Sequence, residues 1–257
     1  MSKELGVAIE AAKKAGKLLM RYYGKTSVRY KADGSVETEA DIRSEKKIIS
    51  ILQKDFPYYS FLGEESGYSG KKSDYVWVID PLDGTTNYMM MNPFFGVSIA
   101  LVYRAEPILG VVSYPHEEEI FFAQKGKGAF LNDRKIHVSD EQKMKNSILT
   151  FAHGLDRNSV VKMTRIFGEL KLITNKVRQI GAPSLQLCYV ACGRTESFLM
   201  VGVNPYDVAA GAIIVKEANG YVTDFSGKTF SVNSKDILAS NRRMHKEILQ
   251  LLKETQA

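Results

Sequence analysis

The stretch YVWVIDPLDGTT, residues 75–86, runs from an apolar segment directly into a bend that carries two acids and two hydroxyls. The β-branched and aromatic residues before Asp80 predict a buried strand. Pro81 and Gly84 are typical turn residues, and a single aspartate is common in a turn. A turn does not need the further side chains of Asp83 and the two threonines. The bend therefore carries more chemistry than its backbone requires.

Helices and strands are predicted on both sides of this bend from the period of the apolar residues. Helices are expected over residues 3–23, from Asp41 to the residue before Pro57, and over 85–91, 157–170, 183–192, 207–219 and 242–254. Strands are expected over residues 75–79, 94–103, 107–114, 119–123, 129–131, 145–152, 175–179, 196–201, 221–224 and 237–240. Residues 25–40 and 61–74 are interpreted as polar loops.

The order of these elements indicates a fold class and a division of the chain. Strands that alternate with helices are typical of layered α/β packing. A boundary near residues 143–148 separates a segment with more strands from one in which strands and helices alternate. We therefore expect two domains, residues 1–146 and residues 147–257, with most of the candidate site residues in the first.

The composition is that of an ordinary folded protein with a positive net charge. The chain has 257 residues, of which 44% are hydrophobic and 25% charged, and its formal net charge is +6. A chain of this length and composition is able to bury a sizeable core. Because the positive charge is spread along the chain without a block of like charges, we expect no nucleic-acid partner. The charge equally suits a small phosphorylated substrate.

No membrane or secretory segment is predicted. The longest apolar stretches, such as VAAGAIIV at 208–215, are far shorter than the ~20 residues of a membrane span. The N-terminal segment mixes charged and apolar residues, unlike a secretory signal. Cys188 and Cys192 lie in one apolar stretch and provide no disulfide framework. A reducing, cytoplasmic location is therefore expected.

Several common catalytic motifs are incomplete. SGKTF at 226–230 resembles the end of a phosphate-binding loop, but Val222 stands where that loop requires a glycine. There is no G-x-S-x-G motif, and the four histidines are isolated from one another. These features argue against a nucleophilic serine or cysteine enzyme and against a zinc site.

Acids in loops at strand ends remain as candidates for catalysis. They are Glu64, Glu65, Asp80, Asp83 and Asp207. Singly, each has a structural explanation as a solvated loop acid, a turn residue or the N-cap of a helix. Together they offer the oxygen ligands that Mg²⁺ prefers, with the Leu82 carbonyl as a further ligand. Acids packed this closely repel one another unless a cation is bound, so the cluster predicts a metal site.

An anion site is predicted beside this cation site. Gly84, Thr85 and Thr86 begin the short helix expected at 85–91. The first backbone N–H groups of a helix attract anions. A cation site next to an anion site suits the hydrolysis of a phosphate ester by a metal-activated water.

Three segments of the chain resemble a known family. GEESG at 63–67, WVIDPLDGTTNY at 77–88 and YDVAAGAIIVKEANG at 206–220 are similar, in order and approximate spacing, to motifs of the inositol monophosphatase family. These are magnesium-dependent, lithium-sensitive phosphatases, and the resemblance covers nearly the whole chain. It implies an α+β fold, a layered α-β-α-β-α sandwich of the sugar phosphatase type, and a homodimer.

The resemblance implies two or three Mg²⁺ ions. Glu64, Asp80 and the Leu82 carbonyl would bind the first ion. Asp80, Asp83 and Asp207 would bind the second, and a third would lie near Glu64. Glu65 is expected beside these ligands rather than among them.

The resemblance also implies which residues activate water. Thr85, together with Glu64 or with Asp41 of ETEAD, would orient and deprotonate the attacking water. Asp41 is also interpreted as the N-cap of the helix that it begins, and both roles are compatible.

Phosphate binding is the third role that the resemblance implies. The backbone N–H groups of Gly84 and Thr85 would hold the phosphate, in a pocket that Leu82, Asp83 and Asp207 also line. Lys31, in the loop before Asp41, matches a lysine that family members carry near the active site.

The leaving-group side of the site departs from the family pattern. Gly181, Ala182 and Pro183 fall where the family has a Gly-Ser/Thr-Ala turn that contacts the substrate, and Pro183 replaces a small residue. Met200 stands where inositol phosphatases carry a glutamate that binds inositol hydroxyls. A methionine cannot accept those hydrogen bonds, and a site built for a hydroxyl loses much without its partner.

Several functions therefore remain open. A phosphomonoesterase for inositol 1-phosphate or a related polyol or sugar phosphate is the leading hypothesis. Fructose 1,6-bisphosphate and then 3'-phosphoadenosine-5'-phosphate are the alternative substrates. A different class of function is binding to RNA or to a transcription factor, with which the +6 charge is compatible.

Overall fold

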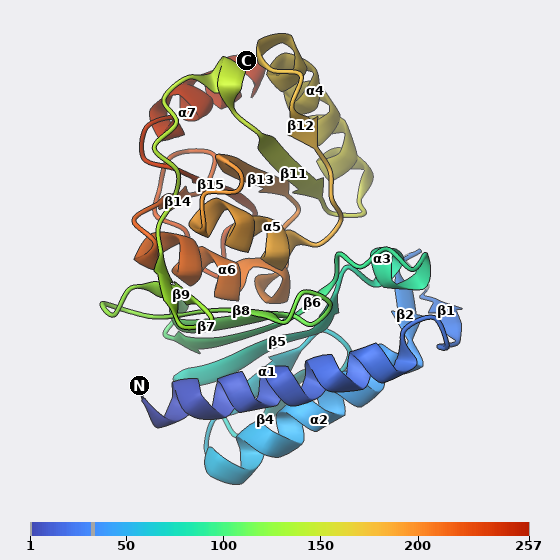
Figure 1. Ribbon diagram of the computed structural model, residues 1–257. Coiled ribbons are helices and arrows are strands. Elements are labelled where there is room, and N and C mark those ends of the chain that lie inside the picture. The colour runs from blue at the N-terminus through green and yellow to red at the C-terminus, as the bar shows by residue number, and fades with distance from the viewer. Residues whose placement is uncertain (1, 32–33, 257) are drawn as a thin grey trace.

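The computed structural model, which describes residues 2–31 and 34–256, has five alternating layers (Figure 1). A pair of helices covers an eight-stranded sheet, and a second pair separates that sheet from a five-stranded sheet. A third pair covers the far face of the five-stranded sheet. This order confirms the α-β-α-β-α sandwich predicted from the sequence.

The first layer consists of α1 (Lys3–Tyr22) and α2 (Glu39–Asp55), which pack on each other and on the eight-stranded sheet. Each helix turns an apolar stripe toward the core. In α1 the stripe contains four fully buried alanines at helical spacing, Ala8, Ala11, Ala12 and Ala15. Small side chains on this face allow the helix to approach its neighbours closely.

The eight-stranded sheet contains the strand that ends in the acidic bend. Its strands, in spatial order, are β10 (Arg134–Ile136), β9 (Ala129–Leu131), β8 (Glu119–Gln124), β7 (Glu106–Tyr114), β6 (Gly96–Tyr103), β5 (Tyr75–Asp83), β3 (Ser60–Gly63) and β4 (Gly67–Gly70). Neighbouring strands are antiparallel except β3 and β5, which are parallel. Helices cover both faces of the sheet, so β5 is buried from Trp77 onward. The short helix α3 (Thr85–Met89) follows β5 after a single residue.

The middle layer consists of α5 (Pro183–Ala191) and α6 (Pro205–Glu217), which are enclosed by the two sheets. All residues of α6 from Val208 to Val215 are buried, which explains why this stretch is apolar without a polar face. Glycines allow the closest approaches. A Cβ on Gly211 would lie 2.5 Å from the Cβ of Leu187 in α5.

The second sheet and its outer helices complete the fold. The strands, in spatial order, are β12 (Val177–Arg178), β11 (Leu149–His153), β13 (Ser197–Val201), β15 (Asp236–Ser240) and β14 (Tyr221–Thr223). β11 is parallel to both of its neighbours, whereas the other pairs are antiparallel. The outer layer consists of α4 (Arg157–Ile173) and α7 (His245–Gln256), whose apolar faces share a core cluster with this sheet.

Some elements differ from those predicted. β1 (Val28–Tyr30) and β2 (Val36–Thr38) form an antiparallel pair in a segment predicted as a loop, and β3 and β4 occupy part of the segment 61–74. The predictions of loops there are wrong because strands of three or four residues are too short to show a clear period. β10 and a 3₁₀ turn, η1 (Met144–Asn146), were also not predicted. β5 continues past the expected end at residue 79 to Asp83.

Two further findings concern the expected location. None of the helices in the described part of the chain is long and apolar enough to cross a membrane. Cys188 and Cys192 are free thiols. The division into domains 1–146 and 147–257 remains a prediction.

A glycine-to-alanine pair tests the packing of α6 on the eight-stranded sheet. A Cβ on Gly110 of β7 would lie 2.5 Å from the carbonyl oxygen of Ala210, which is backbone and cannot rotate away. We expect Gly110→Ala to lower the free energy of unfolding by about 1–3 kcal/mol. Gly168→Ala in α4, where a Cβ meets no atom within 4 Å, should instead raise it by about 0.5–1 kcal/mol. Urea unfolding measures both free energies. Equal changes in the two variants would contradict the close packing of α6 against β7 at Gly110.

Candidate active site

A β-bulge shapes the bend at the end of β5. Asp80 and Asp83 pair with Ser98 and Gly96 of β6, so that two β5 residues between them oppose a single residue of the partner strand. The Leu82 N–H donates to Asp80 Oδ1 at 3.0 Å inside the bulge. A bulge redirects side chains at the end of a strand. Both aspartates are buried here, with exposed fractions of 2% and 3%.

Asp83 connects the bend to the start of α5. Its Oδ2 accepts hydrogen bonds from the backbone N–H groups of Ser184 at 2.8 Å and Leu185 at 3.4 Å, and from the Ser184 hydroxyl. The residue at the N-cap of α5 is Ala182, which has no side-chain acceptor. Asp83 therefore caps this helix from a distant strand. Its Oδ1 accepts no hydrogen bond from the described part of the chain, so that atom is available to a ligand.

Asp41 and Asp207 occupy the same position at the starts of two helices. Each is the third residue of its helix and accepts a hydrogen bond from the backbone N–H of the N-cap residue. Asp41 Oδ2 accepts from Thr38 at 2.9 Å, and Asp207 Oδ2 accepts from Asn204 at 3.3 Å. The interpretation of Asp41 and Asp207 as N-cap residues is therefore wrong, because Thr38 and Asn204 hold that position in two capping boxes.

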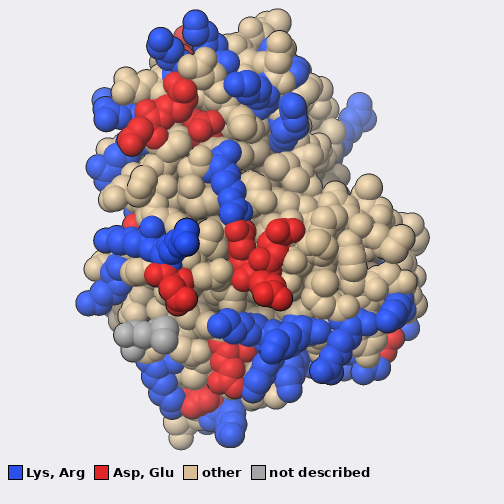
Figure 2. Space-filling model, in the orientation of Figure 1, with Lys and Arg blue, Asp and Glu red and all other residues tan. Residues whose placement is uncertain are grey.

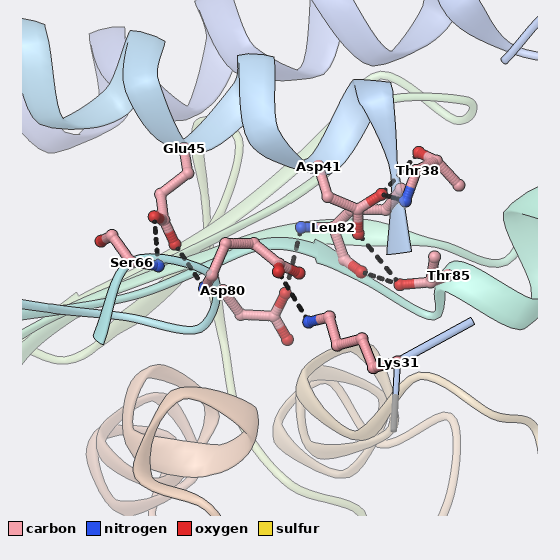
Figure 3. Close-up of polar contacts among 9 residues, drawn as sticks. Lys31, Thr38, Asp41, Glu45, Ser66, Asp80, Leu82 and Thr85 are labelled. Atoms are coloured by element: carbon pink, nitrogen blue, oxygen red, sulfur yellow. Dashed lines mark hydrogen bonds and ion pairs between the residues drawn. The ribbon is translucent and has the colours of Figure 1, made fainter. Parts of the chain in front are cut away.

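The Thr85 hydroxyl lies between Asp41 and the bend (Figure 3). Its oxygen is 3.2 Å from Asp41 Oδ1 and 3.0 Å from the carbonyl oxygen of Leu82. A threonine hydroxyl has one hydrogen, so it donates to one of these acceptors at a time. Gly84, at the N-cap of α3, has a φ of 88°, which directs Thr85 into this position.

The turn between β3 and β4 places Glu64 and Glu65 beside the bend. The Glu64 N–H donates to the carbonyl oxygen of Ile79 in β5 at 3.1 Å. Lys31, just after β1, forms an ion pair with Glu65 Oε2 at 2.6 Å (Figure 3). The other oxygen of Glu65, Oε1, is buried and has no hydrogen-bond partner. The structure thus brings Lys31 to the acids, as the resemblance implied, through its contact with Glu65.

Burial and mutual repulsion raise the pKa values of these acids. Burial, followed by the charges of Glu65 and Asp207, raises the pKa of Glu64 to about 8, while Lys31 opposes the shift. Burial raises the pKa of Asp83 to about 7 and that of Asp207 to about 6. The pKa of Asp80 lies well above its ordinary value because of burial and the charges of Glu64 and Asp83.

This charge distribution fits a divalent cation. Within residues 2–31 and 34–256, Lys31 is the one basic side chain that forms an ion pair at this site, and its partner is Glu65 rather than Glu64, Asp80, Asp83 or Asp207. The donors are carboxylate and carbonyl oxygens, which suit Mg²⁺ better than a soft metal. No three His, Cys, Asp or Glu side chains among the described residues already surround one common position. The fit therefore rests on the kind of donors and on their unbalanced charge.

The expected substrate turn lies against the bend. A Cβ on Gly84 would lie 3.1 Å from the Cβ of Ala182 and 3.2 Å from the carbonyl oxygen of Gly181. The Asn87 side chain links α3 to this turn, because its Nδ2 donates to the carbonyl oxygen of Ile180 at 2.8 Å. Ala182 is fully buried, whereas Pro183 at the start of α5 is half-buried. The structure thus brings residues 181–183 to Gly84, although they lie about 100 residues apart.

Met200 forms none of the polar contacts described above, and it shares a core cluster with Ala182 of the substrate turn. It is in β13, is 4% exposed and belongs to the core cluster between the two sheets. Tyr206, by contrast, lies close enough to Asp207, Glu64 and Asp80 for their charges to raise the pKa of its phenol, after the larger effect of burial.

Two residues of the site were not predicted from the sequence. Ser184 donates to Asp83, and Glu45 of α2 accepts backbone N–H groups of the turn that holds Glu65. The sequence contained a signal for Glu45: an acid on the apolar face of an amphipathic helix, four residues after Asp41. Ser184 is one of many serines and gives no such signal.

Comparisons with known proteins find one family. The model of the inositol monophosphatase family matches residues 1–257. A Nus factor SuhB of Pseudomonas aeruginosa is 37% identical over 97% of this chain and 95% of its own length. An inositol monophosphatase 3 of Solanum lycopersicum is 38% identical over 97% of this chain and 96% of its own. The crystal structure of the extragenic suppressor protein suhB of Bartonella henselae has a TM-score of 0.93 and 34% identity, over 98% and 99% of the two chains.

The raised pKa values predict how the stability of the metal-free protein depends on pH. An acid with a raised pKa binds its proton more tightly in the folded state, so its contribution to stability is lost as the pH rises through the folded pKa. For Glu64, Asp83 and Asp207, with pKa values of about 8, 7 and 6, this loss extends up to about pH 8. We expect the melting temperature of the metal-free protein to fall between pH 6.5 and 8.5.

Magnesium provides the matched comparison. Added Mg²⁺ should raise the melting temperature most at pH 8.5, because the acids are then ionised, and Glu64→Gln should weaken the pH dependence without metal. A melting temperature of the metal-free protein that stays constant or rises over this range would contradict the repulsion among the acids.

Proposed function

This chain belongs to the inositol monophosphatase family, and from that premise we propose that it is a magnesium-dependent phosphomonoesterase. Its substrate would be inositol 1-phosphate or a related sugar or polyol phosphate. The observation that carries the proposal is the group of buried and half-buried acids at the end of β5, next to the first turn of α3 and the Thr85 hydroxyl. The acids suit the cations that accompany a phosphate ester, and the helix N–H groups suit the phosphate itself.

The proposed metal ligands are those that the motifs indicate. Glu64, Asp80 and the Leu82 carbonyl would hold one Mg²⁺ ion. Asp80, Asp83 through its free Oδ1, and Asp207 would hold another, and a third would lie near Glu64. When bound, Mg²⁺ supplies positive charge that stabilises the developing phosphate charge and makes water more acidic.

Thr85 and Asp41 are the proposed partners of the attacking water. Thr85 would accept a hydrogen bond from the water while its own hydrogen points to Asp41 Oδ1, 3.2 Å away. Asp41 is fully buried, and burial raises its pKa, which makes it a better proton acceptor than an exposed aspartate. Glu64 remains the alternative base, since its pKa of about 8 without metal would be lowered by a bound cation.

The phosphate and the leaving group of the substrate would contact different residues near Gly84. The N–H groups of Gly84 and Thr85 would hold the phosphate, with Lys31 adding positive charge from the side of Glu65. Residues 181–183 would contact the leaving group. Because Met200 offers no acceptor for inositol hydroxyls and is buried in the core, fructose 1,6-bisphosphate remains a serious alternative substrate, followed by 3'-phosphoadenosine-5'-phosphate. A homodimer and inhibition by Li⁺ are further proposals from the family resemblance, and a cytoplasmic location is a proposal from the cysteines and the apolar stretches of the sequence.

Release of inorganic phosphate from these three substrates, side by side with Mg²⁺, tests the enzymatic proposal. We expect turnover of at least one substrate and its loss on removal of the metal with a chelator. Asp80→Asn and Asp207→Asn should each abolish turnover, because each removes a proposed metal ligand. Asp74→Asn is the control, since this exposed aspartate lies just before β5 and pairs with Arg104 at the surface. Activity retained by both site variants would contradict the metal assignment.

A binding role is a second candidate, favoured by a basic surface. Figure 2 shows Lys and Arg side chains gathered along the lower front of the molecule, where α1 lies in Figure 1. A groove of about 540 Å³ between α1 and α2 is lined by Arg21, Arg43, Lys46 and Lys47. The relative from Pseudomonas aeruginosa is named a Nus factor rather than an enzyme. RNA or an acidic protein would suit such a groove.

A gel-shift assay with RNA at physiological salt tests this second candidate. If the groove binds RNA, the wild-type protein should shift it, and the double variant Lys46→Glu/Lys47→Glu should shift it more weakly because two cations of the groove are reversed. Absence of a shift by the wild-type protein would remove RNA as a partner. Phosphatase activity should be unchanged in the double variant, since neither lysine contacts the acids.

A further inference from the structure

Glu45 and Ser44 of α2 lie next to the acidic bend but are not among the proposed metal ligands. We propose that they are positioning residues: through backbone contacts they hold two of the three segments that carry the proposed metal ligands, the turn after β3 and the bend of β5, at a fixed separation. This inference rests on the proposed function, because it assigns to α2 the task of arranging that metal site before the metal binds. Asp41 adds a third contact from the same helix.

Glu45 holds the turn between β3 and β4. Its carboxylate accepts the N–H of Glu65 on Oε2 and the N–H of Ser66 on Oε1, both at 2.9 Å (Figure 3). The residue is only 3% exposed. Gly63 makes room for this carboxylate, because a Cβ at that position would overlap Glu45 Oε2. Glu64, enclosed between Gly63 and Glu65, is thereby fixed in place.

Ser44 holds the bend at the end of β5. Its hydroxyl donates to the carbonyl oxygen of Pro81 at 2.8 Å, and the residue is fully buried. Pro81 lies inside the bulge between Asp80 and Asp83. A contact at this carbonyl therefore fixes the part of the backbone from which both aspartates extend.

The spacing of the three α2 residues explains how one helix reaches three segments. Positions 41, 44 and 45 differ by three and four, so their side chains share one face of the helix. That face contacts Thr85 at the start of α3, the bulge of β5 and the turn after β3. Residues from all three segments belong to the proposed site, so a single rigid element sets their relative positions.

Glu45 is suited to this task because it holds the turn with both oxygens of its carboxylate. Both of its oxygens accept backbone N–H groups, which neutralise part of its charge inside the core. A glutamine has one oxygen and one NH₂ group, so it would satisfy one of the two N–H groups and oppose the other. Residues that orient metal ligands typically change metal affinity or activity by about 10- to 100-fold when substituted.

Glu45→Gln and a matched control test the inference by metal binding alone. Glu196 is also a buried glutamate, 8% exposed, whose Oε2 accepts a backbone N–H from Ile148 at 2.7 Å, but it lies by the second sheet. Titration calorimetry with Mg²⁺ should show a dissociation constant about 10-fold or more higher for Glu45→Gln than for the wild-type protein. Glu196→Gln should bind Mg²⁺ as the wild-type protein does, and circular dichroism should confirm that both variants are folded.

Ser44→Ala is the second variant, because it removes one hydroxyl and leaves every carboxylate in place. It should also weaken Mg²⁺ binding, although less than Glu45→Gln does. If folded Glu45→Gln binds Mg²⁺ as tightly as the wild-type protein does, the positioning role is overturned while the proposed function stands. If Glu45→Gln does not fold, the same result in Ser44→Ala overturns it. Equal weakening in Glu196→Gln would overturn it too, since the effect would then be general. Failure of the wild-type protein to bind Mg²⁺ would overturn the proposed function, and the inference with it.

Discussion

Repulsion among buried and half-buried carboxylates is the constraint that the rest of this structure accommodates. Glu64, Asp80, Asp83 and Asp207 come together where β5 leaves the eight-stranded sheet, and the one ion pair with a base beside them within the described chain joins Lys31 to Glu65. Burial of such a group costs free energy unless each acid is protonated, hydrogen-bonded or paired with a cation. The surrounding backbone supplies part of that compensation, and a divalent cation is the partner that would complete it.

The same acids connect the layers of the fold. Asp83 ends a strand of the first sheet and caps α5 of the middle layer, while Asp207 lies in the first turn of α6 within that layer. α2 contacts the bend from the opposite side through Asp41 and Ser44. Asp83 and Asp207 each hold the start of a helix, and both are proposed ligands of a cation. A cation bound to them would therefore stabilise the contacts between the layers as well as the bend itself.

The sequence indicated the residues of the candidate site, whose chemistry is a proposal, but not the geometry around them. The acids of the bend, Thr85 and the layered fold followed from motifs with specific spacing, and the fold class is confirmed. The short strands β1 to β4 were not predicted because three or four residues give no clear period. The capping of α5 by Asp83 could not be predicted, because Ser184 at the start of that helix lies about 100 residues further along the chain. Only the packing of the whole chain brings Asp83 and Ser184 together. Local patterns identify residue types, whereas such contacts depend on the whole chain.

The central claim is that these acids form a cation site whose members hold protons when the metal is absent. Titration calorimetry with Mg²⁺ at pH 7, in two buffers with different ionisation enthalpies, tests it most directly. With pKa values of about 8 for Glu64 and about 7 for Asp83 in the metal-free protein, binding must displace protons. We therefore predict that Mg²⁺ binds and that the apparent enthalpy changes with the buffer in the direction of proton release. No binding, or binding with the same enthalpy in both buffers, would contradict the account.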